Sequence, residues 1–590
     1  MKTRLSITIV LCFLVGLVHA VATYAPTSTH QMLFNGANLS SVPPVVAPPT
    51  PTALVTGWTN VTTALDATGA GTRIDVGGGN LDHADLSTLD PGILTPGTVV
   101  NIFHRAQPYS TKFTFHTDGT EVDPIVINGV TNGSGVRPQI DCGASSISQN
   151  PQDGNATWTQ PYGCWVLTYS RDGGGYQDPV EWMEFRNLEM YGAQGGTTYD
   201  GGAGTYVEGT SNIRLNEARF IKFIGNIFRD SDNGVFTSSI FPNSDIWFQG
   251  NKFIDNGTVG SFLHHNLYFQ AVASRPFNNI VEGNYFGKLR AGAIGTGSLK
   301  HRGTDLIFRY NVVACFSRCL DLVELQDGLP DYVYTNFSAQ EILDRYRTSY
   351  VYGNQFWLDS SRTGISGSAY GIHVGMDTGT ANADDQLYSN STPVAEGEVM
   401  ARGVGSPVYF YNNSLYFNNP SEYYQSIFDL DSGSAGDSRH FGSVVAANNI
   451  IHFDDTSPPS QAYGSHGRST GNITYVAANT AYIPGTEAAF LFEGRDQQVL
   501  DDPQITLVGG TGVTFNQSKD AGFDPLFADV TNNVIELISL KPQAGSSVIG
   551  AALTLPAPMT TFPVLGQPIL PSFGGGTEAR ATTANLGAFE

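Results

Sequence analysis

The hexapeptide FIGNIF at residues 223–228 returns as FQGNKF at residues 248–253, and this repeat predicts the fold. In both copies a Gly-Asn pair stands between two phenylalanines, one three residues before the asparagine and one two residues after it. Related pairs, with glycine, tyrosine or asparagine in first place, recur along the chain and end at Asn226, Asn251, Asn284, Asn311, Asn354, Asn413 and Asn449. Self-similarity at such a spacing is typical of stacked repeat architectures.

The positions around each pair are apolar at fixed offsets. Three residues before the asparagine stand Phe223, Phe248, Val281, Phe308, Val351, Phe410 and Ala446. Two residues after it stand Phe228, Phe253, Phe286, Val313, Phe356, Leu415 and Ile451. Because residues of mixed type alternate with these positions, the pattern indicates two short β-strands separated by a turn at the pair.

The intervals between the asparagines range from 25 to 59 residues, which indicates a constant unit with inserted loops of unequal length. A unit of two or three short strands cannot bury its apolar face alone, so successive units must stack with their strands in parallel, about 4.8 Å per coil. An asparagine in the turn tolerates unusual backbone angles, and its amide can bond to the asparagines above and below. The sequence therefore predicts an all-β parallel β-helix, a solenoid of about ten coils with an asparagine ladder.

The composition agrees with an all-β fold and argues against nucleic-acid binding. The chain has 590 residues, of which only 14% are charged, with 67 glycines and 31 prolines. That is too few charges and too many helix breakers for a helical bundle. The net charge of −23 argues against a nucleic-acid partner.

The ends of the chain differ from its middle. Residues 1–20 combine basic positions, a short apolar run and a small-residue ending, which is typical of a secretory signal peptide and too short to span a bilayer. Residues 21–56 are rich in proline and threonine and predict a linker or arm. We expect the β-helix over residues 57–455 and a C-terminal segment at residues 456–590 that closes or flanks it. The mature protein is expected to be secreted, extracellular or periplasmic, without a membrane span, and monomeric.

Four cysteines remain after the signal peptide: Cys142, Cys164, Cys315 and Cys319. In an oxidising compartment they permit two disulfides, and three pairings are open. Cys315 and Cys319 are close in sequence, although strand geometry could aim them apart. No further ligands stand at zinc-site spacing, so no metal is expected.

With these repeats, the chain resembles a known family, the right-handed parallel β-helix proteins with the pectin lyase-like fold. The resemblance extends beyond the repeats to LTPGTVV at residues 94–100 and DPIVING at 123–129, which look like the N-terminal segment of secreted bacterial β-helix proteins. FDPLF at 523–527, AGSSVI at 544–549 and LGAFE at 586–590 look like that group's closing segment. The resemblance covers roughly residues 90–590. It implies a fold that hosts several chemistries and does not choose among them.

A second strand is expected in each coil after the asparagine turn, at residues 234–237, 264–270, 299–302, 320–324, 371–377 and 427–431. If these strands share one sheet, their outward residues form one patch. The expected members are His264 or His265, Tyr268, Gln270, Lys300, Arg302, Asp321, Glu324, His373, Asp377, Asp429 and Asp431.

The patch overlaps the most basic stretch of the chain. Between residues 288 and 309 stand Lys288, Arg290, Lys300, His301, Arg302 and Arg309, with Asp305 as the one acid. A local reversal of charge in an acidic protein favours an anionic ligand, and an acidic polysaccharide offers carboxylates at a regular repeat. We expect Lys288, Arg290, Gln270, Asp321, Glu324 and His373 to contact this substrate.

The chemistry that fits is β-elimination at a uronate. This reaction needs a cation for the sugar carboxylate, a base for the neighbouring proton and an acid for the leaving oxygen. Arg302 suits the first role because its fork is always charged. Lys300 suits the second, because nearby cations lower the pKa of an ammonium. Tyr268 or His265 could be the acid.

Several alternatives stand beside this hypothesis. Lys300 and Arg302 could pair with Asp321 and Glu324 as a charge ladder across coils. β-helix lyases of the alginate lyase and chondroitinase B type have Lys on one coil and Arg on the next, but here residues 321–324 read DLVE, so that mechanism does not transfer intact.

A glycosidase could instead use the carboxylates of Asp321 with Glu324, or of Asp377 with Asp429. A non-catalytic surface protein or adhesin would use the β-helix as a spacer and sugar-binding face. No cofactor is expected. Calcium is an open alternative, because acidic and amide residues line many turns and some pectate lyases of this fold use it, but no calcium-loop motif is present.

Overall fold

The computed structural model describes residues 61–144, 161–168, 179–199, 204–269, 279–293, 298–323, 349–359, 369–375, 408–418, 425–431 and 443–453, with small gaps inside some of these ranges, and short segments at 146–147 and from 472 onward. The expected signal peptide and proline-rich arm lie outside the described residues. Among those described, no helix is long and apolar enough to cross a membrane.

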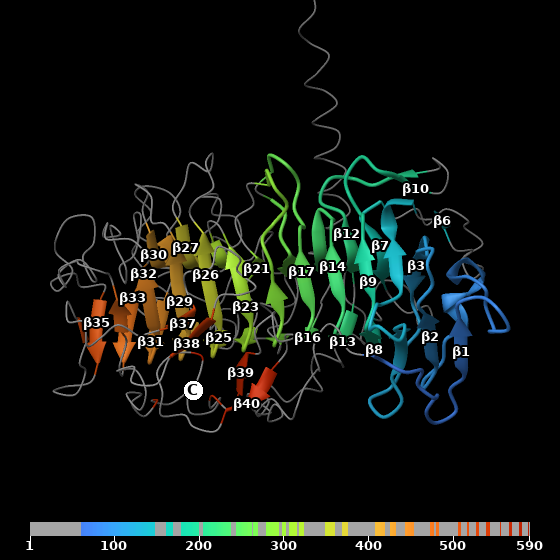
Figure 1. The fold of residues 1–590 in the computed structure, drawn as a ribbon, viewed down its shortest axis with the longest axis horizontal. Coiled ribbons are helices and arrows are strands. Elements are labelled where there is room, and N and C mark those ends of the chain that lie inside the picture. The colour runs from blue at the N-terminus through green and yellow to red at the C-terminus, as the bar shows by residue number, and fades with distance from the viewer. Residues whose placement is uncertain are drawn as a thin grey trace, which may run out of the picture.

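Three parallel sheets form one elongated stack, with the N-terminal strands at one end (Figure 1). In each regular coil the chain adds one strand to the first sheet, one to the second and one to the third, and then returns to the first. Parallel strands joined by such crossovers wind in the right-handed sense. The all-β parallel β-helix predicted from the repeat is confirmed.

The first sheet contains β1 (Arg73–Val76), β2 (Val99–Phe103), β4 (Ile125–Val130), β8 (Val180–Arg186), β13 (Ala218–Ile224), β16 (Ser244–Gln249), β19 (Asn279–Glu282), β22 (Leu306–Arg309), β25 (Ser349–Tyr352), β28 (Val408–Tyr411), β31 (Ser443–Ala447), β33 (Asn472–Val476) and β35 (Ile505–Val508). The second contains β5 (Gln139–Asp141), β9 (Glu189–Tyr191), β14 (Ile227–Arg229), β17 (Lys252–Ile254), β20 (Tyr285–Phe286), β23 (Val312–Cys315), β26 (Gln355–Asp359), β29 (Ser414–Asn418), β32 (Ile450–Phe453), β34 (Thr480–Tyr482) and β36 (Asn516–Gln517). The third contains β6 (Ser146–Ile147), β3 (Thr111–Phe115), β7 (Gly163–Leu167), β12 (Ser211–Leu215), β15 (Asn233–Thr237), β18 (Leu267–Phe269), β21 (Leu299–Arg302), β24 (Arg318–Val323), β27 (Ala369–Gly375) and β30 (Gln425–Asp431).

The core consists of the apolar rows read from the repeat. Phe223, Phe248 and Val281 occupy one register position on adjacent strands of the first sheet, and all are buried. The rings of Phe223 and Phe248 stack across the two coils, with their centroids 4.8 Å apart. Phe228 and Phe253 form the corresponding row in the second sheet, 5.2 Å apart. The period-two pattern therefore identified the inward positions correctly.

The asparagine ladder forms at the turn between the first and second sheets. In each of the first six asparagines the side-chain Nδ2 donates to the side-chain Oδ1 of the next asparagine, at 3.0–3.1 Å. The backbone N–H of the same residue donates to that Oδ1 as well. The side-chain nitrogen also reaches a backbone carbonyl, as from Asn311 to Val281 at 2.9 Å. The ladder asparagines therefore bond to their neighbours above and below, as predicted.

The sequence analysis assigned the unusual backbone angle of the turn to the ladder asparagine, and this prediction was wrong. The residue before the ladder asparagine holds the left-handed conformation, with φ of 64° at Gly225, 57° at Tyr310 and 51° at Asn412. Glycine adopts this conformation without steric cost, which explains its frequency in the pairs. At Gly353 a side chain would also meet the ring of Tyr310 at 2.7 Å.

The described C-terminal residues flank the stack. Val564 packs against Tyr310, Tyr352 and Tyr411 on the outer face of the first sheet. The antiparallel pair β39 (Gly566–Pro568) and β40 (Thr577–Ala579) lies beside the stack and away from its end (Figure 1). Beyond residue 455 the chain also continues the parallel sheets, through β33 to β36, so the first sheet reaches thirteen strands among the described residues, against about ten coils expected.

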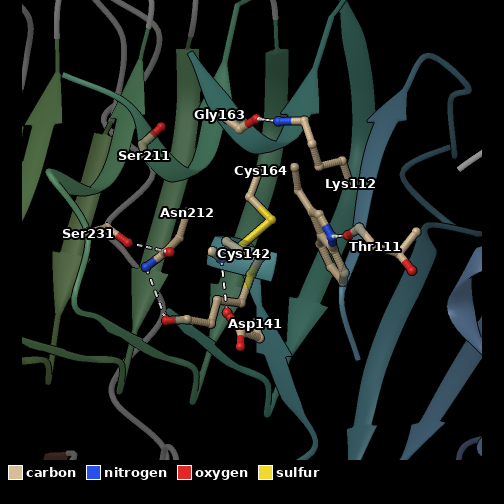
Figure 2. Close-up of a disulfide and its surroundings, with 12 residues drawn as sticks. Thr111, Lys112, Asp141, Cys142, Gly163, Cys164, Ser211, Asn212 and Ser231 are labelled. Carbon is tan, nitrogen blue, oxygen red and sulfur yellow. Dashed lines mark hydrogen bonds between the residues drawn. A yellow bond between two sulfur atoms is a disulfide. The ribbon is translucent and has the colours of Figure 1, made fainter. Parts of the chain in front are cut away.

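Two disulfides resolve the pairing that the sequence left open. Cys142, just after β5, bonds to Cys164 in β7 with a Cα separation of 5.5 Å, as Figure 2 shows. Cys315 at the end of β23 bonds to Cys319 in β24, with a Cα separation of 5.1 Å. Each bond links a cysteine at or just after the end of a second-sheet strand to a strand of the third sheet, inside the core. The second one lies two residues from Asp321 and ties down the start of the strand that carries it.

Candidate functional site

The strands expected to carry the functional patch lie side by side in the third sheet. In register across four consecutive coils stand Tyr268 of β18, Lys300 of β21, Asp321 of β24 and His373 of β27. The flanking residues, such as Leu299 and Leu320, point into the core, so this row lies on the outer face of the sheet. We call these four residues the outer row.

Asp321 is the centre of the outer row. Its carboxylate accepts a hydrogen bond from His373, with 2.5 Å between Nδ1 and Oδ1, and its Oδ2 lies 3.3 Å from Nζ of Lys300. Nη1 of Arg318, on the same strand, lies 3.4 Å from Oδ1. Asp321 and His373 are fully buried, and Lys300 is 5% exposed. The pairing of Lys300 with Asp321, weighed from the sequence, is therefore present, but it is buried and not a solvated surface ladder.

Electrostatics keep Asp321 ionised despite its burial. Burial alone would raise the pKa of this carboxyl group, but the charges of Lys300, Arg318 and His373, together with the hydrogen bond from His373, lower the pKa well below its usual value. One carboxylate thus faces two permanent cations and an imidazole.

Aromatic groups continue the outer row beyond Lys300. Nζ of Lys300 lies 5.9 Å from the ring centroid of Tyr268, whose ring meets those of His265 and Phe236 edge to face at 5.2 and 4.9 Å. All three rings are buried. Tyr268 and His265, both considered as the acid, are therefore neighbours in space.

Several of the expected patch residues are described by their backbone alone or not at all. Arg302 pairs through its backbone with Val323, two positions along β21 from Lys300, and its side chain lies outside the described atoms. Gln270 and Glu324 lie outside the described residues altogether. Asp429 is the next member of the register after His373, described by its backbone alone.

The structure separates the other basic residues of the 288–309 stretch. Nζ of Lys288 lies 4.5 Å from the ring centroid of Trp357, in the second sheet. Arg309 is buried in the first sheet and pairs with Glu282. Arg290 lies in the loop after β20, where its backbone N–H donates to Asn256. The expectation of one basic patch was wrong, because turns and period-two alternation send these side chains to different faces.

His301 of the same stretch points into the core, and this leads to a stability prediction. Its ring packs edge to face on Phe269 at 5.2 Å, and burial lowers its pKa from 6.5 to about 3. Between these two values the unfolded chain binds a proton that the folded chain does not, so the free energy of unfolding falls as the pH falls through this range.

We expect His301→Phe to lose less stability between about pH 7 and pH 4 than the wild type, by up to a few kcal/mol. Denaturant titrations of both proteins at the two pH values measure this difference. Other titrating groups are common to the two proteins and cancel. Equal pH dependence would show that His301 is not held neutral in the core.

The sequence analysis did not identify two residues that lie next to the outer row, Arg318 and Phe236. Arg318 opens β24, two residues before the strand start that was expected. Phe236 lies inside the expected strand 234–237, but an apolar residue gave no signal of function. Phe236 could have been identified from a correct alignment of the coils, because it is in register with Tyr268.

The described residues offer no metal centre. No group of three or more His, Cys, Asp or Glu side chains that could hold a metal ion occurs among them. The asparagines of the ladder turn, which had suggested calcium, use their side chains to bond to each other.

Comparison with known proteins finds only distant solved structures. No protein-family model matches the chain, and no curated protein matches it. Among solved structures, a mutant DFA-IIIase from Arthrobacter chlorophenolicus A6 in complex with DFA-III is 13% identical, with 70% of this chain and 89% of that chain covered and a TM-score of 0.31. Pectate lyase Pel9A is 11% identical, with 85% and 89% covered and a TM-score of 0.29. The chain's own three parallel sheets give it a right-handed parallel β-helix fold. At these identities the activities of those proteins say nothing about the activity of this chain.

Proposed function

We propose that the protein is a secreted, monomeric, carbohydrate-active β-helix protein, and specifically a lyase that cleaves an acidic polysaccharide by β-elimination. The observation that supports this function is the outer row, in which Lys300 stands between Tyr268 and the His373–Asp321 pair on adjacent coils. A cation flanked by two proton-transfer groups is the arrangement that elimination at a uronate requires.

Lys300 takes the charge-neutralising role in this proposal. A carboxylate 3.3 Å away favours the protonated amine, which makes Lys300 a poor base. A sugar carboxylate bound here would acidify the proton on the neighbouring carbon.

His373 takes the role of the base. Its Nδ1 is bonded to Asp321, which orients the imidazole, so the proposal assigns the proton transfer to the other ring nitrogen, Nε2. The ring removes the proton next to the sugar carboxylate, a carbon–carbon double bond forms, and the glycosidic carbon–oxygen bond breaks.

Tyr268 takes the role of the acid that protonates the leaving oxygen. It lies on the opposite side of Lys300 from His373, and the two residues are three coils apart, about 14 Å along the axis.

A second candidate function is polysaccharide binding without catalysis. It is favoured by one observation, the buried and mutually paired state of Lys300 and Asp321, which is also what a structural charge pair would show. The two functions differ in whether covalent bonds of the polymer break.

A product screen distinguishes them. The protein without residues 1–20 is incubated with a panel of polyuronates and glycosaminoglycans, with and without calcium, and ultraviolet absorbance of unsaturated products is recorded. The lyase proposal predicts absorbance with at least one acidic polymer and none with neutral ones. Retention of an acidic polymer on the protein, without new absorbance or new reducing ends, would overturn the lyase and support binding alone.

A further inference from the structure

Arg214 of β12 extends the line of the outer row in the direction away from His373. It is in register with Phe236, and through Tyr268 with Lys300, so three coils separate Arg214 from Lys300. Its guanidinium lies between two aromatic rings, with Cζ 4.5 Å from the centroid of Phe236 and 5.0 Å from that of Tyr162. Its Nε donates to Oδ1 of Asn216 at 2.9 Å.

The charge of Arg214 has no counter-ion in the part of the chain that the structure describes. By contrast, Arg219, Arg229 and Arg309 each form an ion pair with a glutamate. Burial lowers the pKa of Arg214 to about 10. Because a largely desolvated cation without a counter-ion is costly, an anion placed against this guanidinium would be bound favourably.

The surroundings of Arg214 match an acidic sugar. Tyr162 is 45% exposed and offers an aromatic surface beside the guanidinium. A side chain at residue 163 would lie 2.8 Å from Cβ of Arg214, so Gly163 permits the close approach of the two strands here; Gly163 is labelled in Figure 2 beside the disulfide. An aromatic ring packs on a sugar's apolar face, while the arginine fork binds its carboxylate.

We propose that Arg214 and Tyr162 form a remote substrate-binding site, the Arg214 subsite, which binds a carboxylate of the same polysaccharide chain whose reacting unit lies at Lys300. This inference rests on the proposed function and deepens it. Arg214 acts in binding and takes no part in the elimination itself.

The spacing specifies the class of polymer. Adjacent coils are about 4.8 Å apart, which is close to the length of one sugar unit in an extended chain. Arg214 and Lys300 therefore lie about three units apart. In a polymer that alternates acidic and neutral sugars, a uronate at Lys300 would place a neutral sugar at Arg214. The subsite thus selects a polyuronate with a carboxylate on every unit.

The test uses acidic oligosaccharides of defined length with the wild type, Arg214→Gln and, as the matched control, Arg219→Gln on the first sheet. For oligomers of about four units or more, Arg214→Gln should raise KM about tenfold and leave kcat unchanged, because one charge-assisted contact outside the reacting unit is lost. For two-unit substrates all three proteins should have the same KM. An alternating acidic–neutral polymer should show no effect of Arg214→Gln.

The outcomes separate this inference from the lyase itself. Cleavage by the wild type with an unchanged KM in Arg214→Gln would overturn the subsite and keep the lyase. Arg214-dependent binding of long acidic oligomers in calorimetry, without cleavage, would keep the subsite and overturn the lyase. Failure of the wild type to bind any acidic oligomer would overturn both. Equal denaturant midpoints for the three proteins show that the changes act on binding.

Discussion

Asp321→Ala is expected to lower the free energy of unfolding by about 3–5 kcal/mol, because it leaves buried cations without their carboxylate. Asp321 is fully buried and is bonded to His373, with Lys300 and Arg318 within ion-pair distance. Denaturant titration at neutral pH measures the loss. The low pKa of Asp321 gives the sign of a pH effect: the carboxylate stabilises the folded chain above its unfolded pKa, and this contribution disappears as the pH falls through the folded value.

The control for this prediction is Asp66→Ala. Asp66 also pairs with an arginine, Arg73, but its side chain is exposed. Exposed pairs contribute about 0–1 kcal/mol, so this variant should resemble the wild type. Equal and small losses in the two variants would show that the Asp321 cluster is hydrated and not the buried centre described above.

Asn311→Ala is expected to cost a similar amount, about 3–5 kcal/mol, because it interrupts the ladder in the middle of the stack. Oδ1 of Asn311 accepts from the backbone N–H and the side chain of Asn284, and its Nδ2 donates to Val281 and Asn354. Removing the amide leaves these buried groups without their partner, and no water can reach them in a core of stacked side chains. Thermal or denaturant unfolding measures the effect.

Asn132→Ala serves as the control. Asn132 also uses its side-chain oxygen twice, accepting from the backbone N–H groups of Ser134 and Val136, but it does so in an exposed turn. Water replaces those bonds, so the loss should be below about 1 kcal/mol. A ladder variant as stable as the turn variant would contradict the view that the asparagines stabilise the stack.

The fold could be predicted from sequence because its information is periodic. Each coil repeats the same inward positions and the same asparagine, so the seven aligned pairs located the core rows and the ladder directly. The second strands after Asn226 and its equivalents were also placed in one sheet, which brought Tyr268, Lys300, Asp321 and His373 together. The coil count and the sheet extensions beyond residue 455 were harder to predict, because the Asn pairs stop at Asn449.

The chemistry of the site was less accessible to sequence. Lys288, His301 and Arg309 are near Lys300 in sequence, but a turn or a single strand step sends each to another face. Asp321, which pairs with Lys300, and His373, which is bonded to Asp321, come from the next two coils. The loops between these coils differ in length, so separation in sequence does not give distance in space. Arg214 gave no signal because its coil precedes the first Gly-Asn pair, and its lack of a counter-ion is visible only in three dimensions.

The most direct test of the central claim compares kcat/KM of the wild type, Lys300→Met and Lys288→Met on the polyuronate that yields unsaturated product. Methionine keeps the length of each side chain and removes its charge. The outer row predicts a fall of about 100- to 1,000-fold for Lys300→Met, because the charge that stabilises the reacting carboxylate is lost. Lys288, which lies against Trp357 in the second sheet, should be replaceable with little effect. Wild-type activity in Lys300→Met, with both variants folded, would contradict catalysis at the outer row.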